Sequence, residues 1–267
     1  MELFNLFLIA VIQGITEFLP ISSSGHLILL PYLTGQPDQG LVIDVAVHVG
    51  TLGAVILYFR KDVALALAGF GRLVRGRIDT PGAFLALCLI VATIPVVIAG
   101  TIIKLAGAEE MLRSIVLIGW TMLVFGILLW WVDTRAPRIR KAPQWTLKHA
   151  AIMGLWQVIA LLPGTSRSGI TITGARALGY DRPDAARLSM LMSIPTIAAS
   201  GVLMGGKVIV EADLAMARDG ALAAGLAFVS ALAALAVMMR LARSISFTPY
   251  VIYRVVLGLV LLGVAYS

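Results

Sequence analysis

The sequence is poor in charged residues and has a single cysteine. Charged residues make up 13% and apolar residues 60% of its 267 positions, whereas a soluble domain carries about 25% charged residues. This deficit excludes a disordered chain and an ordinary soluble domain. Because Cys88 is the single cysteine, a disulfide framework and a thiolate metal cluster are also excluded. The composition is typical of a polytopic membrane protein.

The net charge of +7 does not require an acidic partner. Lys and Arg concentrate in the cytoplasmic connections of membrane proteins and produce the same excess. We therefore expect membrane lipids, and no nucleic acid, among the partners.

Long apolar runs predict the membrane spans. A hydrocarbon core of about 30 Å requires roughly 20 apolar residues per helix. Six stretches reach or approach this length: 42–59, 81–103, 114–132, 188–205, 220–239 and 247–266. Two other apolar regions, 3–33 and 147–178, are interrupted by proline, hydroxyl and charged residues.

The basic residues predict the direction of each span. Five lie in connection 60–77, five in 135–148, three in 176–187 and two in 240–243. The connections 104–113 and 207–219 carry at least as many acidic as basic residues. The first four connections are therefore expected in the cytoplasm. Region 147–178 must then enter and leave on the inside, and region 3–33 on the outside, as two re-entrant hairpins.

The two broken regions also resemble each other. Residues 19–25 (LPISSSG) match residues 162–169 (LPGTSRSG) with one residue inserted. Opposite direction and similar sequence predict an inverted-topology repeat with its site where the hairpins meet. We expect an all-α polytopic membrane protein with six transmembrane helices and two re-entrant helical hairpins. It forms one domain, 1–267, with repeats at about 1–133 and 147–267 joined by a basic cytoplasmic loop, 133–148.

The first hairpin carries polar side chains that are costly inside a membrane. Gln13 and Glu17 are four residues apart and share a helix face. A carboxylate in an apolar run marks a function by default: Glu17 could be a general base or a ligand of Mg²⁺ or Ca²⁺, or it could make a packing hydrogen bond.

Polar residues continue beyond the proline of this hairpin. Ser22, Ser23 and Ser24 could begin a helix whose free N–H groups bind an anion, or they could only cap that helix. His26 could serve as a group that titrates near neutral pH, or it could only make a hydrogen bond between two helices.

The second hairpin adds a fixed positive charge. The fork of Arg167 matches phosphate oxygens in a bidentate way, with Thr171 one turn further on and Ser166 and Ser168 on either side. The structural alternative is an ion pair between Arg167 and Glu17. His48 and Tyr253 could line the cavity, or they could form structural pairs.

Two motifs carry a family resemblance. Residues 13–26 (QGITEFLPISSSGH) and 163–171 (PGTSRSGIT) resemble the signatures of the bacterial undecaprenyl-diphosphate phosphatase family, of the BacA/UppP type linked to bacitracin resistance. The resemblance implies hydrolysis of undecaprenyl diphosphate to undecaprenyl phosphate and phosphate, which recycles the lipid carrier for cell-wall (peptidoglycan) synthesis. It also implies a divalent cation, Mg²⁺ or Ca²⁺, and an active site toward the periplasm in the bacterial cytoplasmic (inner) membrane.

The same resemblance implies roles for particular residues. Catalytic roles fall on Ser23, Glu17, His26 and Arg167, and Glu17 is the metal ligand. Diphosphate binding falls on Gln13, Ser22, Ser24, Ser166, Ser168 and Thr171. The first motif position is often Glu in the family and is Gln13 here, which counts against a mechanism that needs two carboxylates.

Two questions stay open at this level. The nucleophile is Ser23 deprotonated by Glu17 or His26, or His26 itself, or water; we favour Ser23, with Glu17 and His26 handling protons. The competing function is a transporter, a flippase for the isoprenyl phosphate lipid, because inverted repeats with broken helices are also transporter architecture. The oligomeric state is not predicted.

Overall fold

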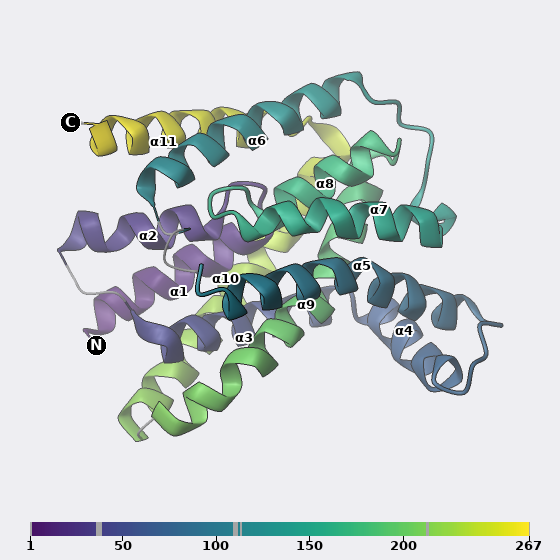
Figure 1. The fold of residues 1–267 in the computed structure, drawn as a ribbon, viewed down its shortest axis with the longest axis horizontal. Coiled ribbons are helices and arrows are strands. Elements are labelled where there is room, and N and C mark those ends of the chain that lie inside the picture. Colours follow the sequence, from purple (N-terminus) through teal and green to yellow (C-terminus); the bar gives the residue numbers. More distant parts are fainter. Residues whose placement is uncertain (1, 36–38, 109–111, 113, 212–213, 267) are drawn as a thin grey trace.

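A computed structural model describes the chain except for residues 1, 36–38, 109–111, 113, 212–213 and 267. Parts of the connections 104–113 and 207–219 therefore lie outside the described residues, as does the last residue of the second repeat. The regular elements of the described part are helices (Figure 1). They are α1 (Leu3–Phe18), α2 (Ser23–Thr34), α3 (Gly40–Tyr58), α4 (Arg60–Leu73), α5 (Pro81–Leu105), α6 (Ile115–Arg135), α7 (Leu147–Val158), α8 (Arg167–Ala177), α9 (Arg182–Glu211), α10 (Leu214–Ser244) and α11 (Thr248–Tyr266), with short 3-10 turns at Ala142–Gln144 and Ile159–Leu161.

The six predicted spans are confirmed as helices long and apolar enough to cross a membrane. They are α3, α5, α6, α9, α10 and α11. Two spans begin six residues earlier than predicted, α9 at Arg182 rather than 188 and α10 at Leu214 rather than 220. In α9 the basic residues that the charge count assigned to a loop form the first turns of the helix. The chain is thus an all-helical, multi-pass membrane protein.

The connection 60–77 differs from its expected form. Residues Arg60–Leu73 form helix α4 rather than a loop. Its five basic residues made the segment look like a connection, but the run between Asp62 and Arg72 consists of Val, Ala, Leu, Gly and Phe, which an amphipathic helix accommodates.

The four basic connections lie at one end of the molecule. Buried Asp133, at the end of α6, accepts hydrogen bonds from Arg176 of α8 (2.9 Å), Arg182 of α9 (2.9 Å) and the backbone N–H of Phe247 (3.2 Å). Asp62 of α4 is paired with Arg187 of α9. These contacts tie α4, α6, α8, α9 and the α10–α11 turn together.

One carboxyl at this end lies in a connection between helices. Burial raises the pKa of Asp181, but the hydrogen bond and charge of Lys141 and the hydrogen bonds from Asp184 together outweigh burial, so this pKa lies below its ordinary value. The carboxylate also accepts the backbone N–H of Asp184 (3.0 Å) in the first turn of α9.

Two pairs of short helices approach each other through the middle of the molecule. In Figure 1, α1 and α2 extend inward from the left and α7 and α8 from the right. The four helices have 16, 12, 12 and 11 residues, which gives lengths of about 16–24 Å at 1.5 Å per residue. None of the four reaches across a hydrocarbon core of about 30 Å.

Glycine allows the first helix of each pair to pack closely on a long helix. A Cβ at Gly14 of α1 would lie 2.7 Å from the carbonyl oxygen of Ala227 in α10, and one at Gly154 of α7 would lie 2.6 Å from that of Ala92 in α5. Only glycine fits at such distances. Each short pair is therefore held against a long helix from the other half of the chain.

Candidate functional site

The two loops that join the short helices are bonded to each other. The backbone N–H of Gly164 donates to Ser24 Oγ (3.3 Å), and Ser168 Oγ donates to the carbonyl of Leu19 (2.9 Å). Each loop thus supplies a serine to the backbone of the other. The predicted meeting point of the two motifs is where these bonds form.

The two loops share a local structure. Ser22 and Ser166 have φ values of 74° and 68° and are the only non-glycine residues in the described part of the chain with positive φ. In each loop this serine lies 3.1 Å, Oγ to Oγ, from the serine two residues later. Such backbone conformations are strained and persist only where the surroundings enforce them.

A helix begins directly after each of these serines. Ser23 is the first residue of α2 and Arg167 is the first residue of α8. The first N–H groups of a helix have no partner within it and favour anions. Ser166 Oγ satisfies one of them by accepting from Gly169 (3.1 Å). The junction therefore joins two helix N-termini, a hydroxyl and a guanidinium.

Glu17 lies at the centre of the junction. Its Oε1 accepts from Arg167 Nη2 (2.8 Å), and its Oε2 accepts from Ser23 Oγ (3.0 Å) and Gln13 Nε2 (2.9 Å). The side chains of Glu17 and Arg167 are only 9% and 13% exposed. The ion pair that the sequence offered as a structural alternative is present, and it lies within reach of the predicted nucleophile.

Gln13 joins Glu17 to a histidine. Its buried amide nitrogen is 3.2 Å from His48 Nε2 as well as 2.9 Å from Glu17, while its Oε1 has no partner. His48 Nδ1 lies 2.7 Å from the carbonyl of Asp44. Since a carbonyl only accepts, Nδ1 carries the proton and Nε2 accepts from Gln13 in neutral His48.

His26 points to a different neighbour. Its Nδ1 lies 2.7 Å from the carbonyl of Ser22, and its Nε2 lies 2.6 Å from the hydroxyl of Tyr253 on α11. Thus Ser23 is brought to Glu17, while His26 is paired with Tyr253.

The remaining predicted residue lies behind Arg167. Thr171 is buried, and its Oγ1 donates to the backbone carbonyl of Arg167 in the same helix (2.8 Å). The same Oγ1 lies 2.6 Å from Ser189 Oγ of α9. The carbonyl of Ser189 in turn accepts from Arg167 Nη1 (3.4 Å). Thr171 and Ser189 therefore support the guanidinium.

A buried arginine lies under the second loop. Arg254 of α11 donates to the carbonyls of Gly164 (3.1 Å) and Thr165 (2.8 Å), and its Nε and Nη1 have no partner. It fixes the loop that carries Arg167 and adds positive charge beneath it.

The donor set fits a divalent cation only in part. No cluster of three His, Cys, Asp or Glu residues exists within the described part of the chain. Near Glu17 the oxygen donors are its carboxylate, the partnerless Oε1 of Gln13 and the hydroxyl of Ser23. Mg²⁺ is held by one or two carboxylates together with substrate phosphates, so the set fits a cation shared with a diphosphate rather than an all-protein cage.

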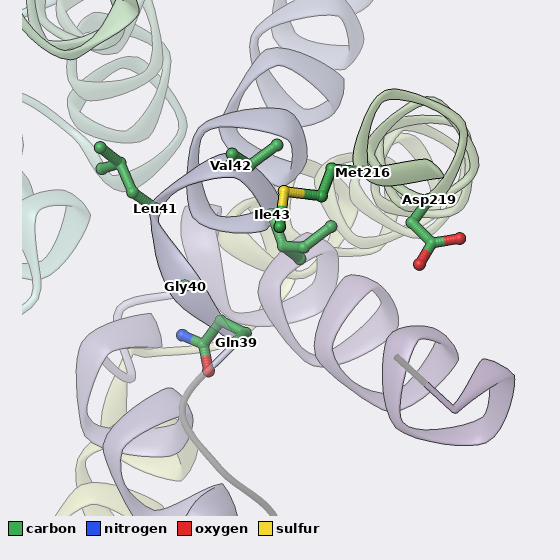
Figure 2. Close-up of a pocket in the computed structure, with 7 residues that line it drawn as sticks. All are labelled: Gln39, Gly40, Leu41, Val42, Ile43, Met216 and Asp219. Atoms are coloured by element: carbon green, nitrogen blue, oxygen red, sulfur yellow. The ribbon is translucent and has the colours of Figure 1, made fainter. Parts of the chain in front are cut away.

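A cavity of about 250 Å³ lies elsewhere, between the starts of α3 and α10. Figure 2 shows Ile43 of α3 beside Met216 of α10, with Gln39 at the beginning of α3 and Asp219 further along α10. None of the predicted site residues lines it.

Comparison with known proteins identifies the family. The family described as "Bacitracin resistance protein BacA" matches residues 6–260. The chain belongs to the BacA family. Proteins named "Undecaprenyl-diphosphatase" from Roseobacter denitrificans and Dinoroseobacter shibae are 69% and 68% identical to it over the whole of both chains. One of the same name from Saccharophagus degradans is 47% identical over 97% of this chain and 96% of its own. The resemblance carried by the two motifs is confirmed.

In this BacA-family chain, one site residue, Ser189, could not be predicted from the sequence. Ser189 is one of four hydroxyl residues in the span 188–205, and only its contacts with α8 distinguish it from the others. His48 and Tyr253 were visible as polar residues in apolar helices, but their partners lie 35 and 227 residues away along the chain.

Proposed function

We propose that this chain is an integral-membrane undecaprenyl-diphosphatase that hydrolyses undecaprenyl diphosphate to undecaprenyl phosphate and phosphate. Full-length relatives at 64–69% identity that bear this name carry the proposal. The reaction returns the carrier lipid to cell-wall synthesis, and it underlies bacitracin resistance in the sense of the family's name.

The junction supports a mechanism with Ser23 as nucleophile. Ser23 Oγ attacks the terminal phosphorus while its proton passes to Glu17 Oε2, 3.0 Å away. The bond from that phosphorus to the bridging oxygen breaks, and undecaprenyl phosphate leaves. Glu17 gives up this proton to solvent, and water then attacks the phosphoserine. Glu17 takes a proton from the attacking water and returns it to Ser23 Oγ as the bond between phosphorus and Ser23 breaks, so that phosphate is released and Ser23 is restored.

Charge stabilisation comes from both halves of the site. Phosphoryl transfer depends on positioning and on neutralising the oxygens of the transferring group. The guanidinium of Arg167 and the N-termini of α2 and α8 supply the positive charge that neutralises these oxygens. The residues that shape the diphosphate site are Gln13, Ser22, Ser24, Ser166, Ser168 and Thr171. His26, hydrogen-bonded to Tyr253, handles the proton at the leaving side.

A divalent cation, Mg²⁺ or Ca²⁺, belongs to this proposal. Glu17 and the Oε1 of Gln13 would hold it together with the diphosphate. When bound, it neutralises phosphate charge.

We further propose that the two short helix pairs are re-entrant hairpins in an inverted repeat, about 1–133 and 147–267. Their length, the matching conformations of Ser22 and Ser166, and the crossed packing of α1 on α10 and α7 on α5 support this. With the basic end in the cytoplasm, by the positive-inside rule, the site opens toward the periplasm of the inner membrane.

The test is phosphate release from undecaprenyl or farnesyl diphosphate by purified protein in detergent. We expect release with Mg²⁺ or Ca²⁺ that stops with chelator and is lost in Ser23→Ala, Glu17→Ala and Arg167→Ala. Ser244→Ala removes an exposed hydroxyl that bonds only within α10 and is the matched control. No release from any isoprenyl diphosphate would contradict the proposal and favour a lipid flippase.

A further inference from the structure

Helix α4 lies at the basic end between spans α3 and α5, and three different surfaces run along it. At about 100° per residue, one sector contains Asp62, Gly69 and Leu73. A Cβ at Gly69 would lie 2.0 Å from the backbone of Gly82 in α5, and Asp62 is paired with Arg187 of α9. This sector is packed against the rest of the protein.

The second sector is apolar and uncovered. Leu67, Phe70 and the following Val74 fall within about 60° of each other on the helix. They are 69%, 48% and 71% exposed. A contiguous exposed apolar surface of this kind marks a site of contact with a partner or a membrane.

The third sector is basic. Lys61 and Arg72 share it with Ala64 and Ala68, which leave room around the long side chains, and Arg60 lies at its border with the apolar sector. Arg75 and Arg77 follow directly. Arg72 is paired with Asp79, but within the described part of the chain no ion pair involves Arg60, Lys61, Arg75 or Arg77. The three sectors are spaced at roughly 120° around the axis.

We propose that α4 lies in the membrane interface and binds anionic phospholipids, with its apolar sector among the acyl chains and its basic sector at the lipid phosphates. Interfacial helices combine these two faces, and juxtamembrane basic residues are attracted to anionic lipid headgroups. A second copy of the chain is a poor occupant, because a two-fold contact would oppose like charges. The proposal is independent of the catalytic reaction.

Depth is measured with single cysteines in a Cys88→Ala background. Leu67→Cys and Phe70→Cys report on the apolar sector, and Ala64→Cys and Ala68→Cys on the basic sector. Each purified protein is labelled with bimane and placed in nanodiscs that contain nitroxide lipids. We expect acyl-chain nitroxides to quench the first pair more strongly and headgroup nitroxides the second. Equal quenching of both sectors at either depth would overturn the interfacial placement.

Lipid selectivity is measured with the probe at Ala68. At equal mole fraction, headgroup-labelled phosphatidylglycerol should quench the bimane fluorescence about twofold more strongly than headgroup-labelled phosphatidylcholine does. This ratio should fall to about one in Arg60→Gln/Lys61→Gln/Arg75→Gln, since the attraction depends on these charges.

The matched control for the charge is Arg138→Gln/Arg240→Gln/Arg243→Gln, which removes three charges from other connections at the same end and should keep the ratio. A ratio of one in the parent protein, or equal losses in both triple variants, would overturn the anionic-lipid proposal. Disulfide cross-linking of two chains through Leu67→Cys in the discs would do so too, by assigning the apolar sector to a dimer.

Discussion

The rings of His26 and Tyr253 lie parallel, with ring planes 2° apart, and His26 Nε2 lies 2.6 Å from the phenol oxygen. The Ser22 carbonyl holds the proton on Nδ1. Neutral His26 therefore accepts its second hydrogen bond from Tyr253 and not from Ser23. The arrangement separates a Ser23–Glu17 pair from a His26–Tyr253 pair within one site.

We expect Tyr253→Phe to lower kcat/KM about tenfold, because His26 loses the partner that orients it. The measurement is phosphate release under the conditions above. Tyr250→Phe is the matched control, since the buried hydroxyl of Tyr250 on the same helix has no partner and its removal should leave turnover unchanged. Wild-type kinetics in Tyr253→Phe would show that His26 needs no partner.

Arg167→Lys should lose almost as much activity as Arg167→Ala, about 10²-fold or more. A lysine keeps the charge but lacks the planar fork that engages two phosphate oxygens. Steady-state kinetics of both variants, with Arg240→Lys at the basic end as control, measure this. A lysine variant near wild-type turnover would reduce Arg167 to a counter-ion of Glu17.

Gln13→Glu should increase the dependence on cation. It replaces an amide that donates to Glu17 (2.9 Å) with a second carboxylate, and two carboxylates at this distance repel unless a cation lies between them. We expect near-normal turnover at saturating Mg²⁺ or Ca²⁺ and a steeper loss as the cation is removed. Unchanged cation titration would argue against a cation at Glu17 and Gln13.

Asp133→Asn should destabilise the protein strongly. Asp133 and Arg176 are fully buried, and removal of one partner of such a pair costs about 3–5 kcal/mol. The readout is thermal unfolding in detergent. Asp79→Asn breaks the exposed pair with Arg72 and should leave the unfolding temperature unchanged. Equal unfolding temperatures for Asp133→Asn and the parent would contradict a structural role for this cluster.

Acid should weaken the contact at Asp181. Because its pKa is lower in the folded state, its contribution to stability is present above the unfolded-state pKa of about 3.9 and disappears as pH falls through the folded-state value. Asp181→Asn should therefore lower the unfolding temperature at pH 7 more than at pH 3. A difference that does not depend on pH would show that the Lys141 contact is not what stabilises the carboxylate.

The six spans could be predicted because hydrophobic length alone determines them, and the two motifs because carboxylate, hydroxyl and guanidinium groups are rare in apolar helices. Helix α4 could not, since its apolar run is short and its flanking charges are those of a connection. The pairing of His26 with Tyr253 depends on how α2 and α11 pack, 227 residues apart. Local pattern does not encode such contacts.

The hydrogen bonds between the two loops divide the site between two halves of the chain. Glu17 and Ser23 come from one half and Arg167 from the other. The backbone of each strained loop is bonded to a serine from the other half of the chain. Neither half has a complete site when alone. We expect a chain cut between α6 and α7 to be inactive as separate fragments and to work only where both fragments are made in one membrane. The two halves of the enzyme thus depend on each other as two subunits would, although one loop joins them covalently.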